Sequence, residues 1–147
     1  LMERAFGPCR FIHIRREDDV AQAVSRLKAE VSQVWHLDGT ETAPRGEARY
    51  DAARLDQFRA EAAAGNSAWE DWFTATGIAP ARLVYEDFAA APAEAVRGLL
   101  NRFDLAPPPG NMISAPNRRM ADTTSTAWAA RYRAERGLPP TGGAHAL

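Results

Sequence analysis

Two adjacent arginines, Arg15 and Arg16, directly follow a short apolar segment, and Ser25 stands nine positions after Arg16. A guanidinium offers paired, charge-assisted hydrogen bonds to an oxyanion, and a serine hydroxyl can add a third donor. If the apolar segment is a strand and a helix follows it, these groups lie at the carboxyl end of the strand. Ligands of α/β proteins bind there, and a helix N-terminus at that place favours an anion. An arrangement of this kind could hold a phosphate.

The same arginines have a simpler interpretation as solvated side chains. Three acidic residues follow them directly, namely Glu17, Asp18 and Asp19, and runs of mixed charge usually mark a solvated surface. Taken alone, the residues favour this surface interpretation over an anion site.

The elements that would position these residues can be predicted from the hydrophobic pattern. Residues 11–14 are short, apolar and β-prone, and they follow Gly7-Pro8, which predicts a buried strand ending near Arg15. A helix should begin at Asp18 or Asp19, since acidic residues favour the first turn. Its apolar stripe would consist of Val20, Val24, Leu27, Val31 and Val34.

The rest of the chain continues as a helix-rich pattern. Residues 37–49 form a predicted loop, and a second helical region should run from Asp51 to Gly77, with a kink or restart at Gly65-Asn66. A second strand is expected over residues 82–85, a helix opened by Pro92, and a last helix over about 124–136. The expected buried side of the Pro92 helix is Val96, Leu99, Leu100 and Phe103.

The order strand, helix, strand, helix predicts parallel pairing and an α/β, helix-rich fold. A parallel sheet usually needs several strands and a cover on both faces, so two strands are too few. We therefore expect residues 1–138 to be part of a larger α/β domain whose N-terminal strands are missing, with 139–147 as a disordered tail. A small, mostly helical domain with a two-stranded ribbon remains the alternative.

Composition narrows the function classes. The formal charge of -1 over 147 residues gives no reason to expect a nucleic-acid partner or an anionic membrane. Cys9 is the only cysteine and the histidines are scattered, so we expect no disulfide, no metal site and a cytoplasmic location. No apolar run is long enough for a transmembrane segment.

Several segments in order resemble the bacterial trehalose 2-sulfotransferase family. The longest is FIHIRREDDVAQAVS over residues 11–25. Others are Lys28-Ala29-Glu30, Trp35-His36, Tyr50-Asp51, Ala68-Trp69-Glu70 with Trp72-Phe73, residues 84–88, Arg119-Met120-Ala121-Asp122, Trp128 and residues 131–133. The ordered set covers about residues 10 to 135 and is more specific than any of its pieces.

The resemblance implies the C-terminal portion of a P-loop-kinase-like sulfotransferase fold. The implied activity is transfer of a sulfuryl group from 3'-phosphoadenosine 5'-phosphosulfate (PAPS) to a carbohydrate or glycolipid hydroxyl. In sulfotransferases an arginine at a strand end and a serine on the next helix hold the 3'-phosphate of the donor, which here correspond to Arg16 and Ser25. Arg119, in a late loop, resembles a further contact to the same nucleotide. Arg16 and Ser25 are nine positions apart, whereas many other sulfotransferases have one residue fewer between the pair, so Arg15, which would lengthen the step, is the less likely match.

The chain also departs from the family it resembles. It has no Gly/Ser/Thr-rich loop for the 5'-phosphosulfate, and the family's general base belongs to the half that has no counterpart here, so no catalytic residue is assigned. The chain alone should then be inactive. The acceptor stays open, and the resemblance is compatible with a homodimer. The alternative function is a non-enzymatic helical interaction or regulatory fragment.

The remaining conspicuous residues have plain interpretations. Trp69, Trp72 and Phe73 recur at helical spacing and should be core, with sugar stacking as the minor alternative. The carboxylates of Tyr85-Glu86-Asp87-Phe88 should bind backbone amides or an arginine where a strand leaves the sheet. His13 should simply be packed.

Overall fold

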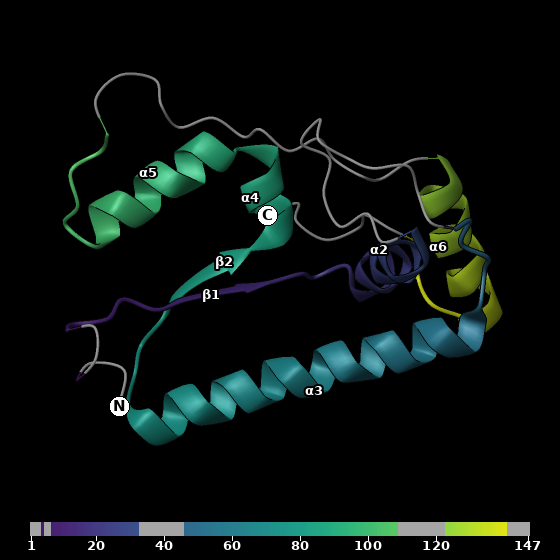
Figure 1. The fold of residues 1–147 in the computed structure, drawn as a ribbon, viewed down its shortest axis with the longest axis horizontal. Helices are drawn as coiled ribbons and strands as arrows, with labels where there is room; N and C mark the ends of the chain where they lie inside the picture. Colours follow the sequence, from purple (N-terminus) through teal and green to yellow (C-terminus); the bar gives the residue numbers. More distant parts are fainter. Residues whose placement is uncertain (1–3, 5–6, 33–45, 109–122, 141–147) are drawn as a thin grey trace. The chain divides into compact units, whose positions relative to one another are not determined.

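The computed structural model describes residue 4 and residues 7–32, 46–108 and 123–140. Their elements, shown in Figure 1, are β1 (Ile12–Arg15), α2 (Asp19–Ser32), α3 (Ala52–Thr76), β2 (Ala81–Val84), α4 (Tyr85–Ala90), α5 (Pro92–Arg102) and α6 (Thr123–Arg136). Internal contacts divide the chain into two compact units. We call Leu1–Glu17 with Gly65–Ala115 the sheet unit, and Asp18–Ala64 with Pro116–Leu147 the helical unit.

The sheet unit contains β1 and β2, which lie side by side as a parallel pair (Figure 1). The register joins Ile12 to Ala81 and Arg15 to Val84, so both strands end at the same edge. The predicted parallel pairing and helix-rich α/β class are thus confirmed. Within the described residues these two strands form the whole sheet.

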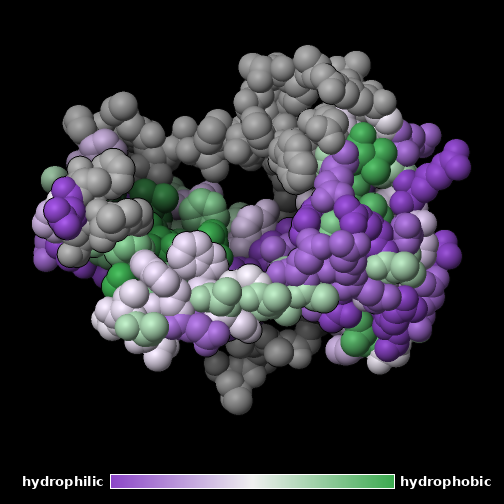
Figure 2. All heavy atoms as spheres, turned by 60° about the horizontal axis from the view of Figure 1, so that its bottom comes forward, coloured by the Kyte–Doolittle hydropathy of each residue, from purple (hydrophilic) through white to green (hydrophobic). Residues whose placement is uncertain are grey.

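The two faces of β1 differ in burial, because successive side chains of a strand point to opposite sides. His13 is buried, whereas Ile12 and Ile14 are 49% and 47% exposed. The expectation of a buried strand is therefore wrong for the two isoleucines. Figure 2 shows hydrophobic side chains, in green, at the surface of this unit.

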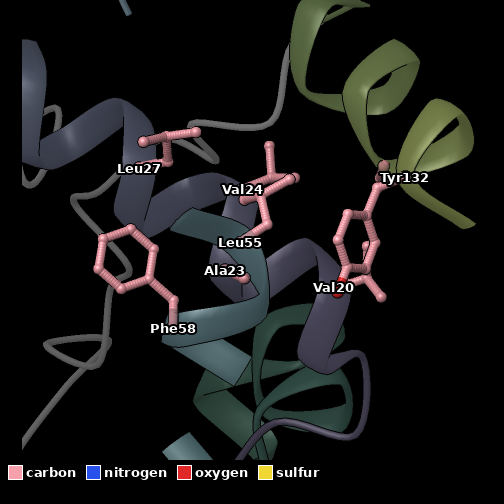
Figure 3. Packing of buried hydrophobic residues seen from close by; sticks show 8 residues of the cluster. Val20, Ala23, Val24, Leu27, Leu55, Phe58 and Tyr132 are labelled. Carbon is pink, nitrogen blue, oxygen red and sulfur yellow. The ribbon is translucent and has the colours of Figure 1, made fainter. Parts of the chain in front are cut away.

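The helical unit has a closed apolar core between three helices. Figure 3 shows side chains of α2, the first half of α3, and α6 pointing toward one another. The core consists of Val20, Ala23, Val24, Leu27, Leu55, Phe58, Ala129 and Tyr132. The predicted stripe on α2 is confirmed for its first three members, but Val31 is 38% exposed and Val34 lies outside the described residues.

Helix α3 runs without interruption, so the predicted restart at Gly65-Asn66 is wrong, whereas the kink stays a prediction. The helix begins after Asp51, whose side chain accepts the Arg54 N–H at 3.0 Å as an N-cap. It ends as predicted at Gly77, whose φ of +66° is typical of a residue that terminates a helix. The Ile78 N–H then donates a hydrogen bond to the Phe73 carbonyl, which closes the last turn. The alanines around Gly65 have high helix propensity, which offsets the cost of one glycine.

Two short helices follow β2 in the sheet unit. Tyr85 was expected to end the strand, but it begins α4, a six-residue helix that the sequence analysis did not predict. Pro92 opens α5 as predicted. The apolar side expected for α5 is only partly buried, since no residue of this helix is fully buried. Helix α6 matches its predicted range.

No helix in the described part of the chain is long and apolar enough to cross a membrane. The expected single domain over residues 1–138 stays a prediction, and most of the expected tail, residues 141–147, lies outside the described residues.

Candidate functional site

Arg16 lies directly after β1, at the edge where both parallel strands end. Because Arg15 pairs with Val84, the residue beside Arg16 on the neighbouring strand end is Tyr85. The guanidinium carbon of Arg16 lies 4.4 Å from the centroid of the Tyr85 ring, a cation–π contact. The side chain of Arg16 is 24% exposed, which makes it a partly buried cation.

Glu86 holds both the side chain and the backbone of this segment. One carboxylate oxygen, Oε1, lies 3.7 Å from the Nε atom of Arg16. The other, Oε2, accepts the backbone N–H of Glu17 at 3.1 Å. The prediction that this acidic pair binds an amide or an arginine is confirmed for Glu86. Asp87, by contrast, has an exposed side chain.

The outer end of the Arg16 guanidinium is available to a ligand. Its Nε is buried without a hydrogen bond and faces Glu86. Within the described part of the chain, its terminal nitrogens Nη1 and Nη2 have no hydrogen-bond partner. A fork of two such donors matches two oxygens of a phosphate. Arg15 is exposed.

Ser25 lies on α2 in the helical unit and is half-buried. A serine inside a helix commonly bonds back to the carbonyl four residues earlier, as Ser32 does to Lys28 at 2.8 Å. The Ser25 hydroxyl has no hydrogen-bond partner among the residues that the structure describes. It is therefore a donor that an external ligand could use.

The start of α2 is firmly fixed within the helical unit. Asp18 caps the helix by accepting the Ala21 N–H at 2.8 Å, and the same oxygen, Oδ1, accepts a bond from Arg133 at 2.5 Å. Arg133 is buried, with 8% exposure, and comes from α6. Asp18, one of the three acidic residues that follow the arginine pair, thus forms an ion pair with Arg133.

The three predicted site residues belong to different parts of the chain. Arg16 belongs to the sheet unit and Ser25 to the helical unit, and that they share one phosphate stays a prediction. Arg119 lies outside the described residues.

His13 belongs to an ionic cluster that the sequence analysis missed. Its Nδ1 lies 3.1 Å from Glu70 of α3, and Arg82 of β2 reaches the other oxygen of that carboxylate at 2.5 Å. The hydrogen bond from Arg82 is the main cause that lowers the pKa of Glu70 below its ordinary value. His13 is buried, but the expectation that it is simply packed is wrong, because its ring contacts Glu70. The cluster ties α3 to both strands.

The tryptophans of α3 are more exposed than expected. Phe73 is buried at 5% exposure, but Trp69 and Trp72 are 53% and 36% exposed, with their rings perpendicular at 5.6 Å. The core prediction is therefore correct for Phe73 and wrong for Trp69 and Trp72.

A second network links α6 to α3 in the helical unit. The hydroxyl of buried Tyr132 donates to Asp56, and Arg136 donates to both oxygens of the same carboxylate. These bonds, with that from Arg136 first, lower the pKa of Asp56 to about 2. Arg59 bonds both the Tyr132 hydroxyl and Asp19. The network positions α6 against α3.

In the described ranges, no group of three or more His, Cys, Asp or Glu side chains could hold a metal ion. The arrangement instead offers an arginine fork and a hydroxyl, which are suited to binding an anion.

Comparison with known proteins gives two findings. The sequence pattern of the Stf0 sulphotransferase family matches residues 1–135. Trehalose 2-sulfotransferase of Mycobacterium tuberculosis (strain ATCC 35801 / TMC 107 / Erdman) is 32% identical over 138 residues, covering 88% of this chain and 48% of that protein. Trehalose 2-sulfotransferase of Mycolicibacterium smegmatis (strain ATCC 700084 / mc(2)155) is 32% identical over 135 residues, covering 87% and 48%. The chain thus spans about half the length of these relatives.

Proposed function

The chain belongs to the Stf0 sulphotransferase family, and from this premise we propose that it carries the part of a PAPS-dependent sulfotransferase that binds the 3'-phosphate of the donor. The observation that supports this most is Arg16, a partly buried arginine at a strand end whose terminal nitrogens have no partner in the described part of the chain. Because Glu86 faces only the Nε edge of the guanidinium, the two terminal nitrogens can donate to an anionic ligand.

The proposed reaction moves a sulfuryl group between two oxygens. The bond from sulfur to the 5'-phosphate oxygen of PAPS breaks, a bond from sulfur to an acceptor hydroxyl oxygen forms, and the hydroxyl proton leaves to a base. The products are a sulfate ester and adenosine 3',5'-bisphosphate. Positioning and fixed positive charge do most of the work in such transfers.

In this proposal the residues of the chain bind rather than react. Arg16 donates two hydrogen bonds to the 3'-phosphate, Ser25 donates a third, and Arg119 assists. The 3'-phosphate is remote from the reacting sulfur, but the energy of binding it can orient the donor.

We further propose that the parallel pair is one part of a larger, P-loop-kinase-like sheet completed by polypeptide outside these residues. Two features support this: Ile12 and Ile14 are half exposed on one face of β1, and a parallel sheet is normally covered on both faces. The loop for the 5'-phosphosulfate and the general base would come from that part, so the chain alone would be inactive.

The acceptor is proposed to be a carbohydrate or glycolipid hydroxyl. The two relatives are both named trehalose 2-sulfotransferases, which makes a sugar the acceptor class to test first. A homodimer is compatible with the proposal.

The test is an NMR titration of the chain with adenosine 3',5'-bisphosphate, because NMR also detects weak binding. Adenosine 5'-phosphate, which lacks the 3'-phosphate, serves as the comparison ligand. Arg16→Ala should weaken binding of the bisphosphate by about 1.5 to 3 kcal/mol, the usual contribution of hydrogen bonds to a charged group. It should leave the affinity for the monophosphate nearly unchanged.

The matched control is Arg15→Ala, which removes the same charge from an exposed neighbour. It should change the affinity for the bisphosphate less than about threefold, because exposed charges are screened. Equal losses from both variants, or equal binding of both nucleotides by the unaltered chain, would contradict the assignment. Equal binding of the two nucleotides would instead favour the alternative, a non-enzymatic interaction or regulatory role.

A further inference from the structure

We propose that Glu86 is a positioning residue, whose carboxylate orients Arg16 so that its two terminal nitrogens face the phosphate of the donor. The inference rests on the proposed function and adds a residue to it. Glu86 itself touches no ligand in this proposal, because it acts through the Nε edge of the arginine.

The geometry that carries the inference lies wholly within the sheet unit. Glu86 stands in the first turn of α4, which begins directly where β2 ends. Its oxygens reach two different groups of the segment that leaves β1, the Nε of Arg16 at 3.7 Å and the backbone N–H of Glu17 at 3.1 Å. One carboxylate therefore fixes the side chain and the backbone of the same segment.

Tyr85 restricts the guanidinium in a second direction. Its ring supports the planar group at 4.4 Å, while Glu86 occupies the Nε edge. With one face of the guanidinium against Tyr85 and its Nε edge against Glu86, the far edge remains for a ligand. That edge carries the donors Nη1 and Nη2. A long arginine side chain loses much rotamer entropy when it binds a ligand, and prior orientation reduces that loss.

A charge argument points the other way and makes the proposal testable. A carboxylate near a phosphate repels it, so removal of Glu86 without any positioning role should leave affinity unchanged or increase it. A decrease in affinity is expected only if orientation of Arg16 outweighs this repulsion.

The experiment compares Glu86→Gln with Asp87→Asn in the NMR titration with adenosine 3',5'-bisphosphate. Both variants remove one negative charge from adjacent positions of α4, and Asp87 is exposed. The glutamine keeps an oxygen that can accept the Glu17 N–H, so the backbone contact is preserved. Glu86→Gln should weaken binding by about threefold to tenfold relative to Asp87→Asn, the range for one partly buried polar contact.

A double-mutant cycle shows whether the effect passes through Arg16. In an Arg16→Ala background there is no guanidinium to orient, so Glu86→Gln should have no further effect on affinity, within about twofold. If Glu86 had only a structural role, Glu86→Gln would still weaken binding in that background. The Nε–H signal of Arg16 gives a ligand-free readout, and its exchange with water should be faster in Glu86→Gln and unchanged in Asp87→Asn.

The outcomes separate the two claims. If the unaltered chain prefers the bisphosphate over adenosine 5'-phosphate but Glu86→Gln matches Asp87→Asn, the positioning role is refuted and the proposed function stands. The same holds if the effect of Glu86→Gln survives in the Arg16→Ala background. If the unaltered chain shows no preference for the bisphosphate, the proposed function fails and this inference fails with it.

Discussion

Removal of the Tyr132 hydroxyl should destabilise the helical unit by about 1 to 2 kcal/mol at neutral pH. Tyr132→Phe deletes the bond donated to Asp56 and the bond accepted from Arg59 at 3.2 Å. A bond to a charged group contributes about 1.5 to 3 kcal/mol. The expected loss is smaller here, because the Asp56 side chain is 45% exposed and keeps its two bonds from Arg136.

The same variant should change the dependence of stability on pH. The pKa of Asp56 is lowered from 3.8 to about 2 in the folded chain. Its contribution is therefore fully present above pH 3.8 and is lost as the pH falls toward 2. Tyr132 is one cause of the low pKa, so in Tyr132→Phe the folded pKa should rise and the loss of stability between these pH values should become smaller.

Urea unfolding at pH 7 and across the acid range measures both effects. The matched control is Tyr50→Phe, which removes a hydroxyl bonded at 2.6 Å to Glu135 in an exposed setting. It should cost less than about 0.5 kcal/mol, as surface substitutions usually do. Equal costs for the two variants, or an acid profile that Tyr132→Phe leaves unchanged, would refute the network as described.

Three further substitutions test the fold. Leu55→Ala should reduce the free energy of unfolding by about 2 to 5 kcal/mol, because Leu55 is fully buried, and urea unfolding measures the loss. Gly65→Ala should increase it by about 0.5 to 1 kcal/mol, since a Cβ there meets nothing within 4 Å, and a helix that restarted at this point would show no gain. Glu70→Gln should make unfolding less sensitive to pH below the ordinary carboxyl pKa of 4.5, because the lowered pKa of Glu70 gives stability that is lost on acidification.

Local sequence signals were sufficient for most of the elements. The stripe of Val20, Val24 and Leu27 predicted α2, and Gly77 predicted the end of α3. Helix α4 was missed because six residues are too few for a periodic pattern. Its signal was the acidic pair Glu86 and Asp87, which favours a first helical turn.

Burial was predicted less well than periodicity, because it depends on what packs against each face. Ile12 and Ile14 alternate with His13 as a strand should, but the alternation does not reveal that α3 covers the histidine side. Trp69 has the helical spacing of a core residue and is nevertheless exposed. A hydrophobic pattern identifies an apolar face, and only the tertiary structure shows whether the chain covers it.

The surroundings of Arg16 can be predicted from the sequence only in part. Parallel strands that end together bring the residues after them together, so Arg16 implies a neighbour at Tyr85 or Glu86. The register between β1 and β2 was the missing quantity, and sequence spacing does not give it. The pairing of Asp18 with Arg133 joins residues far apart in the chain, and no local pattern indicates it.

A crystal structure with adenosine 3',5'-bisphosphate would test most directly whether Arg16 and Ser25 hold the same phosphate. We expect oxygens of the 3'-phosphate at about 2.7 to 3.2 Å from the terminal nitrogens of Arg16 and from the Ser25 hydroxyl. A bisphosphate bound elsewhere, or a 3'-phosphate that contacts only one of the two groups while the other faces away, would contradict the account.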